Sequence, residues 1–371
     1  MHRFAFPTTI HFGPGARKLV AENLKAAGCK RPLLVTDKGL AALPVVGEFR
    51  SFLSEFELEV FSGVQGNPTA SQARAGAHAY RAHDADSVIG FGGGAALDVA
   101  KVVALMAAHP GDVLEYAWDH PGVRPIDKPL PHFVALPTTA GTGSEVGRSS
   151  VISEDDTHVK RIVFSAALLA RAVFADPELT LGLPANITAA TGMDALTHNI
   201  ESYLSPAYHP LCDGIALEGL RIVSRALPLV HKNGENLGAR ADMLMGSMMG
   251  AIAFQKDLGA VHSCAHALST VADLHHGLAN GIMIDHVMRF NRPAAEEKMQ
   301  ELARVAGVPD LIDWLGNLKA ELGIPGKLNS LGVKPEQLPR LVDIAFADIC
   351  HQTNPRPCSR RDFEGLFAAA L

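Results

Sequence analysis

The stretch Ser87-Val88-Ile89-Gly90-Phe91-Gly92-Gly93-Gly94-Ala95 joins a short apolar run to a cluster of glycines. The apolar run Ser87–Phe91 predicts a buried β-strand, and the segment Ala95–Ala107 that follows predicts a helix. Residues Gly90–Ala95 fit the pattern G-x-G-x-x-G/A, whose bare backbone amides at a helix N-terminus favour a phosphate group. Taken alone, the motif predicts a plain strand-to-helix turn as readily as a phosphate site.

Strand and helix signals alternate on both sides of this motif. Strands are predicted at Pro32–Thr36, Leu58–Phe61 and His132–Pro137, and a helix at Pro68–His83. This alternation favours a parallel sheet with helices on both faces. After Asp176-Pro177 the strand signals nearly vanish, and helix-length segments follow one another: Ala185–Leu204, Pro210–His231, Ala239–Phe254, Val261–Leu274, Ala294–Ala306, Pro335–Asp348 and Arg361–Ala370.

The length agrees with this division. At roughly 150 residues per domain, 371 residues make two or three domains. We expect an α/β domain over residues 1–180 and an all-helical domain over residues 181–371.

Composition excludes several classes of protein. The net charge is −6, without the basic excess expected of a nucleic-acid-binding protein. No apolar run approaches the length of a membrane span, and Met1–Pro7 lacks the apolar segment of a secretory signal. The five cysteines are scattered without CxxC spacing, which favours reduced thiols over disulfides or a cysteine zinc site. We therefore expect a cytoplasmic protein without a nucleic-acid or membrane partner.

A second loop and an acidic residue accompany the glycine turn. The loop Pro137–Glu145 contains three threonines, a serine and two glycines, and it follows a predicted strand. Small-residue loops at the carboxyl ends of parallel strands meet in one crevice, where ligands usually bind. Asp37 ends the strand Pro32–Thr36, where a carboxylate favours the ribose of NAD over the 2′-phosphate of NADP. A solvated loop and a helix-capping acid are the alternatives.

Histidines cluster in the helical half. Five of the 17 lie between residues 262 and 286, where an even distribution would place about one. His262 and His266 are four residues apart, as are Asp194 and His198, so each pair shares one face of a helix. A buried carboxylate with several imidazoles suits Fe²⁺ or Zn²⁺, whereas a single Asp/His pair is usually a salt-bridged helix face.

Several segments together resemble the iron-containing (group III) alcohol dehydrogenase family, over essentially the whole chain. They are Gly92-Gly93-Gly94 with Asp98 and Ala100-Lys101; Pro137-Thr138-Thr139 with Gly141-Thr142-Gly143-Ser144-Glu145; Asp176-Pro177-Glu178-Leu179-Thr180; Ala190–His198; Gly259 with His262 and His266; His276-Gly277; and Asn354-Pro355-Arg356.

The resemblance implies a dehydroquinate-synthase-like fold with the active site between its two domains. It implies one Fe²⁺, or Zn²⁺ in its place, held by Asp194, His198, His262 and His276. It implies NAD as the cofactor, with Asp37 at the position associated with NAD preference. Further cofactor contacts are implied at Gly92, Gly93, Gly94, Ala95, Asp98, Thr138, Thr139, Thr142, Ser144 and Lys160. Members of the family are commonly homodimers or larger homo-oligomers.

The implied activity is hydride transfer between NAD(H) and a small primary or secondary alcohol or its carbonyl partner. We expect His266, one helical turn from His262, to relay a proton or contact the nicotinamide ribose; a packing role is the alternative. Arg148, Phe254 and Lys256 are candidate substrate contacts. The two cations suit an anionic tail, and ordinary solvated cations are the alternative. Alternatives are a glycerol-dehydrogenase-like or maleylacetate-reductase-like enzyme, or a non-catalytic sensor of nucleotide or metal.

Overall fold

A computed structural model describes residue 6 and residues 8–371. The expectation that the N-terminus is no secretory signal rests on Met1–Pro7, of which all but Phe6 lie outside the described residues. The chain divides into two compact units. Of the described residues, the sheet unit comprises those up to Thr139 together with Ser144–Thr180, and the helical unit comprises Ala140–Gly143 and Leu181–Leu371. The short segment Ala140–Gly143, which the division at residue 180 assigns to the first domain, thus packs with the second.

A parallel sheet forms the centre of the sheet unit, as the alternation of strand and helix signals predicts. Its order within the described residues is β1-β8-β5-β4-β2-β3, with every neighbouring pair parallel. The strands are β1 Thr9–Phe12, β2 Pro32–Asp37, β3 Glu59–Val64, β4 Ser87–Gly92, β5 His132–Pro137 and β8 Ala172–Ala175. β4 and β5 are direct neighbours, so the loops that follow them leave the same edge of the sheet.

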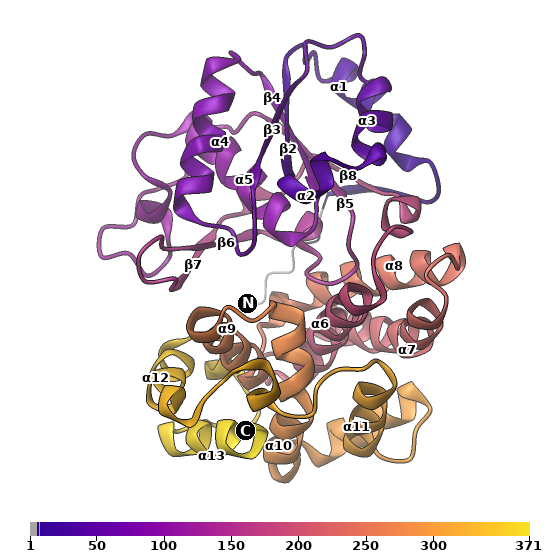
Figure 1. Cartoon of the computed structure of the whole chain (residues 1–371), viewed down its shortest axis with the longest axis vertical. Coiled ribbons are helices and arrows are strands. Elements are labelled where there is room, and N and C mark those ends of the chain that lie inside the picture. The colour runs from indigo at the N-terminus through magenta and orange to yellow at the C-terminus, as the bar shows by residue number, and fades with distance from the viewer. Residues whose placement is uncertain (1–5, 7) are drawn as a thin grey trace. The chain divides into compact units, whose positions relative to one another are not determined.

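Helices cover both faces of this sheet (Figure 1). On one face, α1 and α3 pack on the sheet, and the ring of Phe49 in α3 stacks on Phe91 of β4 at 4.9 Å. On the other face, α4 and α5 lie side by side, and a Cβ on Gly76 of α4 would meet Val103 of α5. The helices of this unit are α1 Val20–Ala26, α2 Lys38–Ala41, α3 Pro44–Ser51, α4 Ala70–Ala82 and α5 Gly94–Ala108.

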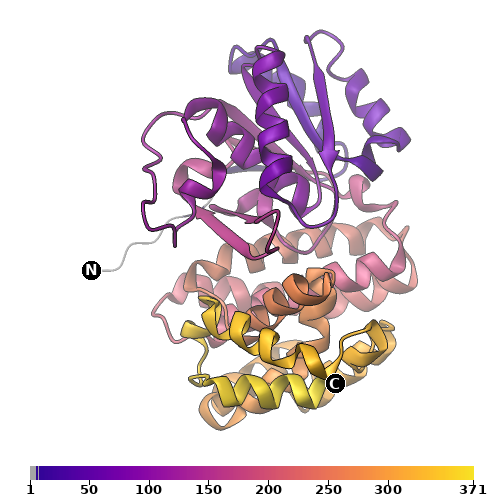
Figure 2. The ribbon, with the colours of Figure 1, turned by 60° about the vertical axis from the view of Figure 1, so that its left-hand side comes forward.

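Four strands do not appear in the sequence-based prediction. Two of them, β6 Ser149–Ser153 and β7 Lys160–Phe164, form an antiparallel pair outside the main sheet, seen in Figure 2. The other two, β1 and β8, are four residues long each. Runs this short carry little periodicity, and they become strands because a neighbouring strand supplies their hydrogen bonds.

The second unit is built from helices, in agreement with the sequence-based expectation. In Figure 2, α13 (yellow) lies along α12, and Arg360 of α13 forms an ion pair with Asp343 of α12. The helices are α6 Ala185–Leu204, α7 Pro210–Lys232, α8 Leu237–Ala253, α9 Ala260–Ala272, α10 His276–Ala306, α11 Leu311–Glu321, α12 Leu338–Ala347 and α13 Arg360–Ala370.

Helix α10 is much longer than the predicted segment Ala294–Ala306, because it begins at His276 and spans 31 residues. Pro293 lies inside it, and Ala295 has non-helical backbone angles (φ −138°, ψ 22°). Proline removes a backbone donor and kinks a helix without always ending it. The sequence pattern therefore predicts only the part of α10 that follows the kink, while the part before the kink begins with His276.

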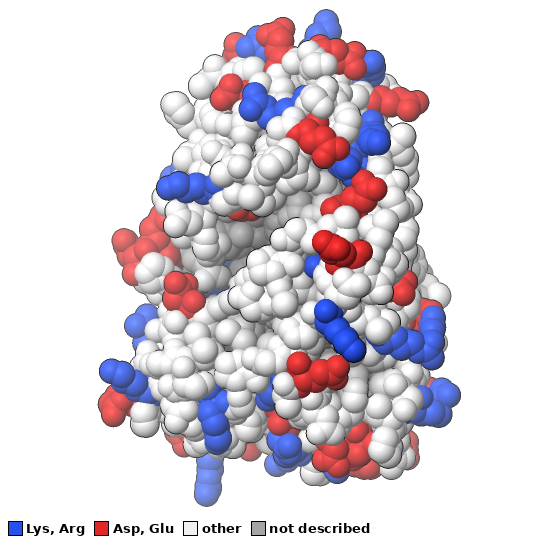
Figure 3. All heavy atoms as spheres, turned by 45° about the vertical axis from the view of Figure 1, so that its right-hand side comes forward, with Lys and Arg blue, Asp and Glu red and all other residues white. Residues whose placement is uncertain are grey.

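The surface carries both signs of charge. Figure 3 shows lysine and arginine side chains interspersed with aspartate and glutamate on the face drawn, without a large area of one sign. Within the described residues, no helix combines the length and the apolar character needed to cross a bilayer. All five cysteines lie in the described part of the chain and are buried free thiols.

Candidate metal and dinucleotide sites

Helix α6 contributes two neighbouring polar side chains to the interior of the helical unit. Asp194 and His198 lie one turn apart, and their side chains are 3% and 4% exposed. His198 Nε2 lies 3.8 Å from Asp194 Oδ1. The four-residue spacing seen in the sequence therefore places both groups on the buried face of one helix.

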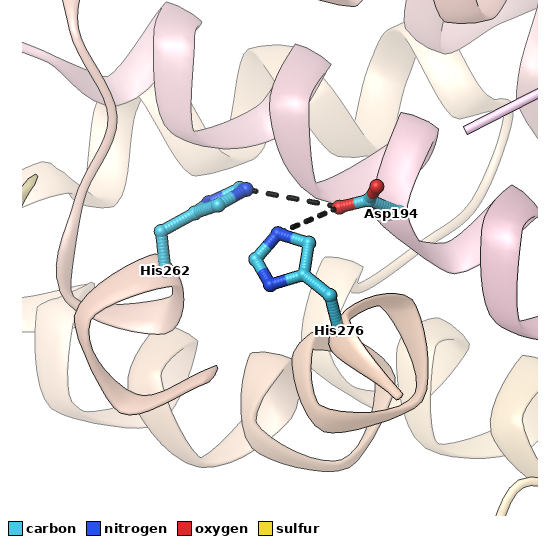
Figure 4. A group of neighbouring side chains, drawn as sticks. All are labelled: Asp194, His262 and His276. Carbon is cyan, nitrogen blue, oxygen red and sulfur yellow. Dashed lines mark ion pairs between the residues drawn. The ribbon is translucent and has the colours of Figure 1, made fainter. Parts of the chain in front are cut away.

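Two further imidazoles reach the same carboxylate oxygen from other helices. His262 of α9 places Nε2 3.8 Å from Asp194 Oδ1, and His276 at the start of α10 places Nε2 3.5 Å from it. Figure 4 shows the carboxylate facing both rings. His276 is the most open of the four side chains, with 22% of its surface exposed. The structure thus places all three implied histidines near one oxygen of Asp194. The donor atoms of Asp194, His262 and His276 lie within 4.8 Å of one another, a group that does not include His198.

These separations fit a single metal ion. Bonds of about 2.1 Å in tetrahedral geometry hold neighbouring donor atoms roughly 3.4 Å apart. The nitrogen-to-oxygen distances of 3.5–3.8 Å are close to that spacing, whereas they are too long for direct hydrogen bonds. One carboxylate and three imidazoles form a donor set suited to Fe²⁺ or Zn²⁺.

The surroundings favour the metal-binding protonation states of His198 and Asp194. Burial lowers the pKa of His198 to about 4, so its imidazole is neutral near pH 7. Burial by itself would raise the pKa of Asp194, but the surrounding histidines outweigh it and hold that pKa well below its usual range. A neutral imidazole and an ionised carboxylate are the metal-binding forms of these side chains. For His262, burial alone would lower the pKa, but the neighbouring carboxylates of Asp194 and Glu201 outweigh it and raise that pKa to about 9.

Gly277 allows α10 to approach α6 closely enough for His276 to reach the site. A Cβ on Gly277 would lie 2.2 Å from the carbonyl oxygen of Ala190, which no packing tolerates. The glycine that follows His276 in the sequence is therefore explained by a helix contact.

Two side chains fix the orientation of Asp194. Asn280 Nδ2 donates to Asp194 Oδ1 at 2.7 Å, and Thr142 Oγ1 lies 3.4 Å from Oδ2. The resemblance implies Thr142 as a cofactor contact, whereas the structure places its hydroxyl beside the metal-site carboxylate. Asn280 was not singled out from the sequence, although its position one turn after His276 on α10 is a usable signal.

His266 is held by a partner that the sequence did not reveal. Its Nδ1 lies 2.7 Å from Asp348 Oδ2, and its ring stacks on His276 with centroids 5.3 Å apart. Burial alone would raise the pKa of Asp348, but His266 and donors from Ser263 and the Cys350 backbone outweigh it and lower that pKa. An ionised Asp348 accepts the hydrogen on Nδ1, which leaves Nε2 of His266 as a proton acceptor.

The glycine turn and the threonine loop lie side by side, as the order of the strands requires. The amide of Thr138 donates to the carbonyl of Gly92 at 3.0 Å, and a Cβ on Gly93 would lie 3.2 Å from Thr139. Gly93 precedes the first turn of α5 and supplies no side-chain cap. The N-terminus of α5 therefore offers backbone amides to an anion, and Gly93, Gly94 and Ala95 are all partly exposed.

Asp37 lies next to this turn. It ends β2, and its Oδ2 lies 3.6 Å from where a Cβ on Gly92 would be. Its Oδ1 accepts from the Leu40 amide at 2.8 Å, so the carboxylate also caps α2. This geometry agrees with the capping interpretation of Asp37, while the contact with the ribose of NAD stays a prediction.

Three other predicted cofactor contacts have protein partners. Asp98 Oδ1 accepts from the Ser144 hydroxyl at 2.5 Å, and Oδ2 accepts from the Val151 amide at 2.9 Å. Both side chains are buried, so they connect α5 to the segment leading into β6. Lys160 is the first residue of β7 and pairs with Ser153.

The candidate substrate contacts have different surroundings. Lys256 is 1% exposed, and its ammonium forms an ion pair with Asp213. The Arg148 guanidinium lies over the ring of Phe164, 5.4 Å from its centroid. The ring of Phe254 lies 5.2 Å from that of His198, so it lies beside one of the candidate metal ligands.

Comparisons with known proteins cover the whole chain. Residues 7–177 match the family model described as iron-containing alcohol dehydrogenase, and residues 188–371 match the C-terminal model of the same family. A 4-hydroxybutyrate dehydrogenase of Cupriavidus necator is 38% identical over 98% of each chain. An NAD-dependent methanol dehydrogenase of Bacillus methanolicus is 34% identical over the full length of both. The structure of a 1,3-propanediol oxidoreductase superposes with a TM-score of 0.94 at 35% identity over all of both chains.

Proposed function

The chain belongs to the iron-containing alcohol dehydrogenase family, and on that premise we propose that it interconverts small neutral primary alcohols and their aldehydes. It is an NAD-dependent oxidoreductase with iron as its metal. The observation that carries the proposal is the convergence of three imidazoles on one carboxylate oxygen.

We assign Asp194, His198, His262 and His276 as the metal ligands. A divalent ion held there would supply Lewis-acid polarisation of the substrate oxygen, and NAD would supply the hydride acceptor or donor. Asn280 and Thr142 hold the Asp194 carboxylate in place, so that Oδ1 faces the three imidazoles. Because His276 is the most exposed of the four, the substrate approaches the site from its side.

His266 is the proposed proton acceptor in alcohol oxidation. Its Nδ1 hydrogen is committed to Asp348, so Nε2 takes the hydroxyl proton and returns it in aldehyde reduction. Stacking on His276 holds the ring beside a proposed ligand.

The dinucleotide pyrophosphate is assigned to the N-terminus of α5, at Gly92, Gly93, Gly94 and Ala95, with Thr138 and Thr139 alongside. Asp37 is assigned to the adenosine ribose. Asp98 and Ser144 are assigned an indirect role. Their buried side chains are hydrogen-bonded to each other and thereby hold the loop in place. Lys160 is retained as a proposed contact from β7.

The preference for neutral substrates rests on the two cations. The ammonium of Lys256 is already paired with Asp213, which leaves it a poor receptor for an anionic tail, while the Arg148 guanidinium lies over the ring of Phe164. Phe254, beside His198, supplies an apolar wall for a short carbon chain. We further propose a cytoplasmic homodimer or larger homo-oligomer.

The experiment combines metal analysis with a substrate panel. Purified protein is analysed for bound iron and zinc, and NAD reduction is followed with 1,3-propanediol, 1-butanol and 4-hydroxybutyrate. We expect metal-dependent turnover, with kcat/KM for 1-butanol at least tenfold above that for 4-hydroxybutyrate, because the two differ mainly in the carboxylate. A preference for 4-hydroxybutyrate would overturn the neutral-substrate proposal. Turnover in metal-free protein would favour a maleylacetate-reductase-like enzyme, and metal or nucleotide binding without turnover would favour a sensor.

A further inference from the structure

Glu201 is a buried carboxylate that neither the sequence motifs nor the proposed chemistry uses. It lies on α6, seven residues after Asp194 and on the same face of the helix. Its side chain is 1% exposed. A carboxylate so far from water is costly unless donors surround it, so its partners identify its role.

Three donors, all from the beginning of α9, converge on Glu201. Oε1 accepts from the Val261 amide at 2.7 Å. Oε2 accepts from His262 Nδ1 at 2.6 Å and from the His262 amide at 3.3 Å. One side chain of α6 thereby fixes both the backbone and the imidazole of a residue on α9.

This contact decides which nitrogen of His262 faces the metal site. A carboxylate that accepts from Nδ1 requires the hydrogen on that nitrogen. The lone pair is then on Nε2, the atom that lies 3.8 Å from Asp194 Oδ1. A carboxylate behind a metal-binding imidazole also makes the imidazole a stronger donor.

The sequence segments around Gly259 and Asn354 support the contact between Glu201 and the start of α9. A Cβ on Gly259 would lie 2.6 Å from Glu201 Oε1 and 2.9 Å from Asn354 Oδ1, so only glycine leaves room for both side chains. Asn354 Oδ1 accepts from the Ala260 amide at 3.2 Å, and its amide group is held by Asn291. The segments around Gly259 and Asn354 therefore act together with Glu201 as an external cap for α9.

We propose that Glu201 is a positioning residue that holds His262 in the Nδ1–H tautomer and thereby sets the affinity of the metal site. The proposal rests on the assignment of Asp194, His198, His262 and His276 as metal ligands. Asn354 caps the same helix without touching the imidazole. A substitution at Asn354 therefore tests support of the helix separately from positioning of the His262 ring.

The test measures binding of Zn²⁺ and Co²⁺ to metal-stripped protein. In Glu201→Gln the side-chain oxygen still accepts from Val261, but the amide group cannot accept from Nδ1. We expect this variant to bind Zn²⁺ about 10- to 100-fold more weakly than wild type and to show an altered Co²⁺ absorption spectrum. Asn354→Ala, the matched control, is expected to melt at a lower temperature with its Zn²⁺ affinity changed less than threefold.

The outcomes separate the inference from the proposed function. If wild type binds no metal, or Asp194→Asn binds it as well as wild type does, the metal-site assignment fails. If Asp194→Asn loses metal while Glu201→Gln binds as tightly as wild type, the role of Glu201 is overturned and the function stands. Equal weakening in Glu201→Gln and Asn354→Ala would reduce Glu201 to a cap and overturn the proposal.

A second measurement needs no change at Glu201. Long-range ¹H–¹⁵N correlation spectra of zinc-loaded protein labelled at histidine report the tautomer of each ring, and His262→Gln identifies the signal by its loss. We expect the Nδ1–H form for His262. An Nε2–H signal from that ring would overturn the proposal even if Glu201→Gln failed to fold.

Discussion

The carboxylate of Asp37 serves two requirements at once. One oxygen caps α2 through the Leu40 amide, and the other lies beside the glycine turn. Local spacing identifies the residue, whereas the pairing of β2 with β4 brings it to Gly92. The two roles are separable, because asparagine keeps the capping oxygen and loses the charge.

Asp37→Asn should therefore change cofactor choice without changing stability. Removing the charge removes the repulsion of a 2′-phosphate, and we expect the ratio of kcat/KM for NADP to that for NAD to rise about tenfold, or about 1.4 kcal/mol. The measurement is the initial rate with each cofactor at saturating alcohol, with the melting temperature as control. An unchanged ratio would remove Asp37 from the cofactor site.

Glu145 is a buried acid with a measurable consequence for stability. Burial raises its pKa from 4.5 to about 7. The folded state then holds a proton that the unfolded state releases, so stability falls as the pH rises from about 4.5 to 7 and the loss is complete above 7. Lys101 opposes this shift but does not cancel it.

Glu145→Gln mimics the protonated acid and should flatten this dependence. We expect a gain in the free energy of unfolding at pH 8 of at most about 3 kcal/mol, and no gain at pH 4. Urea unfolding at both pH values measures it, with Glu22→Gln at an exposed position as control. Equal effects at pH 4 and pH 8 would contradict the raised pKa.

Among the elements, the helices that carry the metal site depend on close contacts more than on propensity. The sequence predicted α6 and α9 as helix-length segments in the half of the chain where strand signals nearly vanish. It predicted only the part of α10 that follows the kink, since Pro293 reads as a break although the helix continues through it. Strands β1 and β8 were missed because four residues are too few for a periodicity.

Gly277→Ala tests the approach of α10 to α6. The added Cβ would overlap the Ala190 carbonyl, so we expect the helices to separate, with a loss of about 1–3 kcal/mol in stability and weaker Zn²⁺ binding. Thermal unfolding with and without Zn²⁺ measures both effects.

Gly316 in α11 provides the matched control, because a Cβ there meets no atom within 4 Å. Gly316→Ala should instead stabilise the protein by about 0.5–1 kcal/mol, as alanine does within an open helix. If both substitutions changed the stability in the same direction, the helix contact at Gly277 would not be the cause of the loss.

At the scale of the whole molecule, the two units hold different parts of the chemistry. The four proposed metal ligands belong to the helical unit, while the glycine turn and Asp37 belong to the sheet unit. The loop after β5 is shared between them, with Thr139 in one unit and Thr142 in the other. Metal and cofactor should therefore stabilise different segments of the chain.

Hydrogen exchange followed by mass spectrometry tests this division. Zn²⁺ added to metal-stripped protein should slow exchange at least tenfold in peptides from α6, α9 and the start of α10, because binding suppresses their local opening. NAD should slow exchange in peptides spanning Ser87–Ala108 and His132–Thr139. Protection by Zn²⁺ confined to the sheet unit would contradict the proposed ligands.

The sequence by itself determined the fold class and the family. The motifs behind them are local or periodic, such as a glycine turn after a strand and polar pairs at the spacing of one helical turn, and the four candidate metal ligands are implied by the resemblance that these motifs carry. The tertiary structure decided what holds the site in place. His262 meets Glu201 across 61 residues, His266 meets Asp348 across 82, and Asp194 meets Asn280 across 86. It also decided that Lys256 is neutralised by Asp213. No spacing rule encodes such contacts, because they exist only once the helices have packed together.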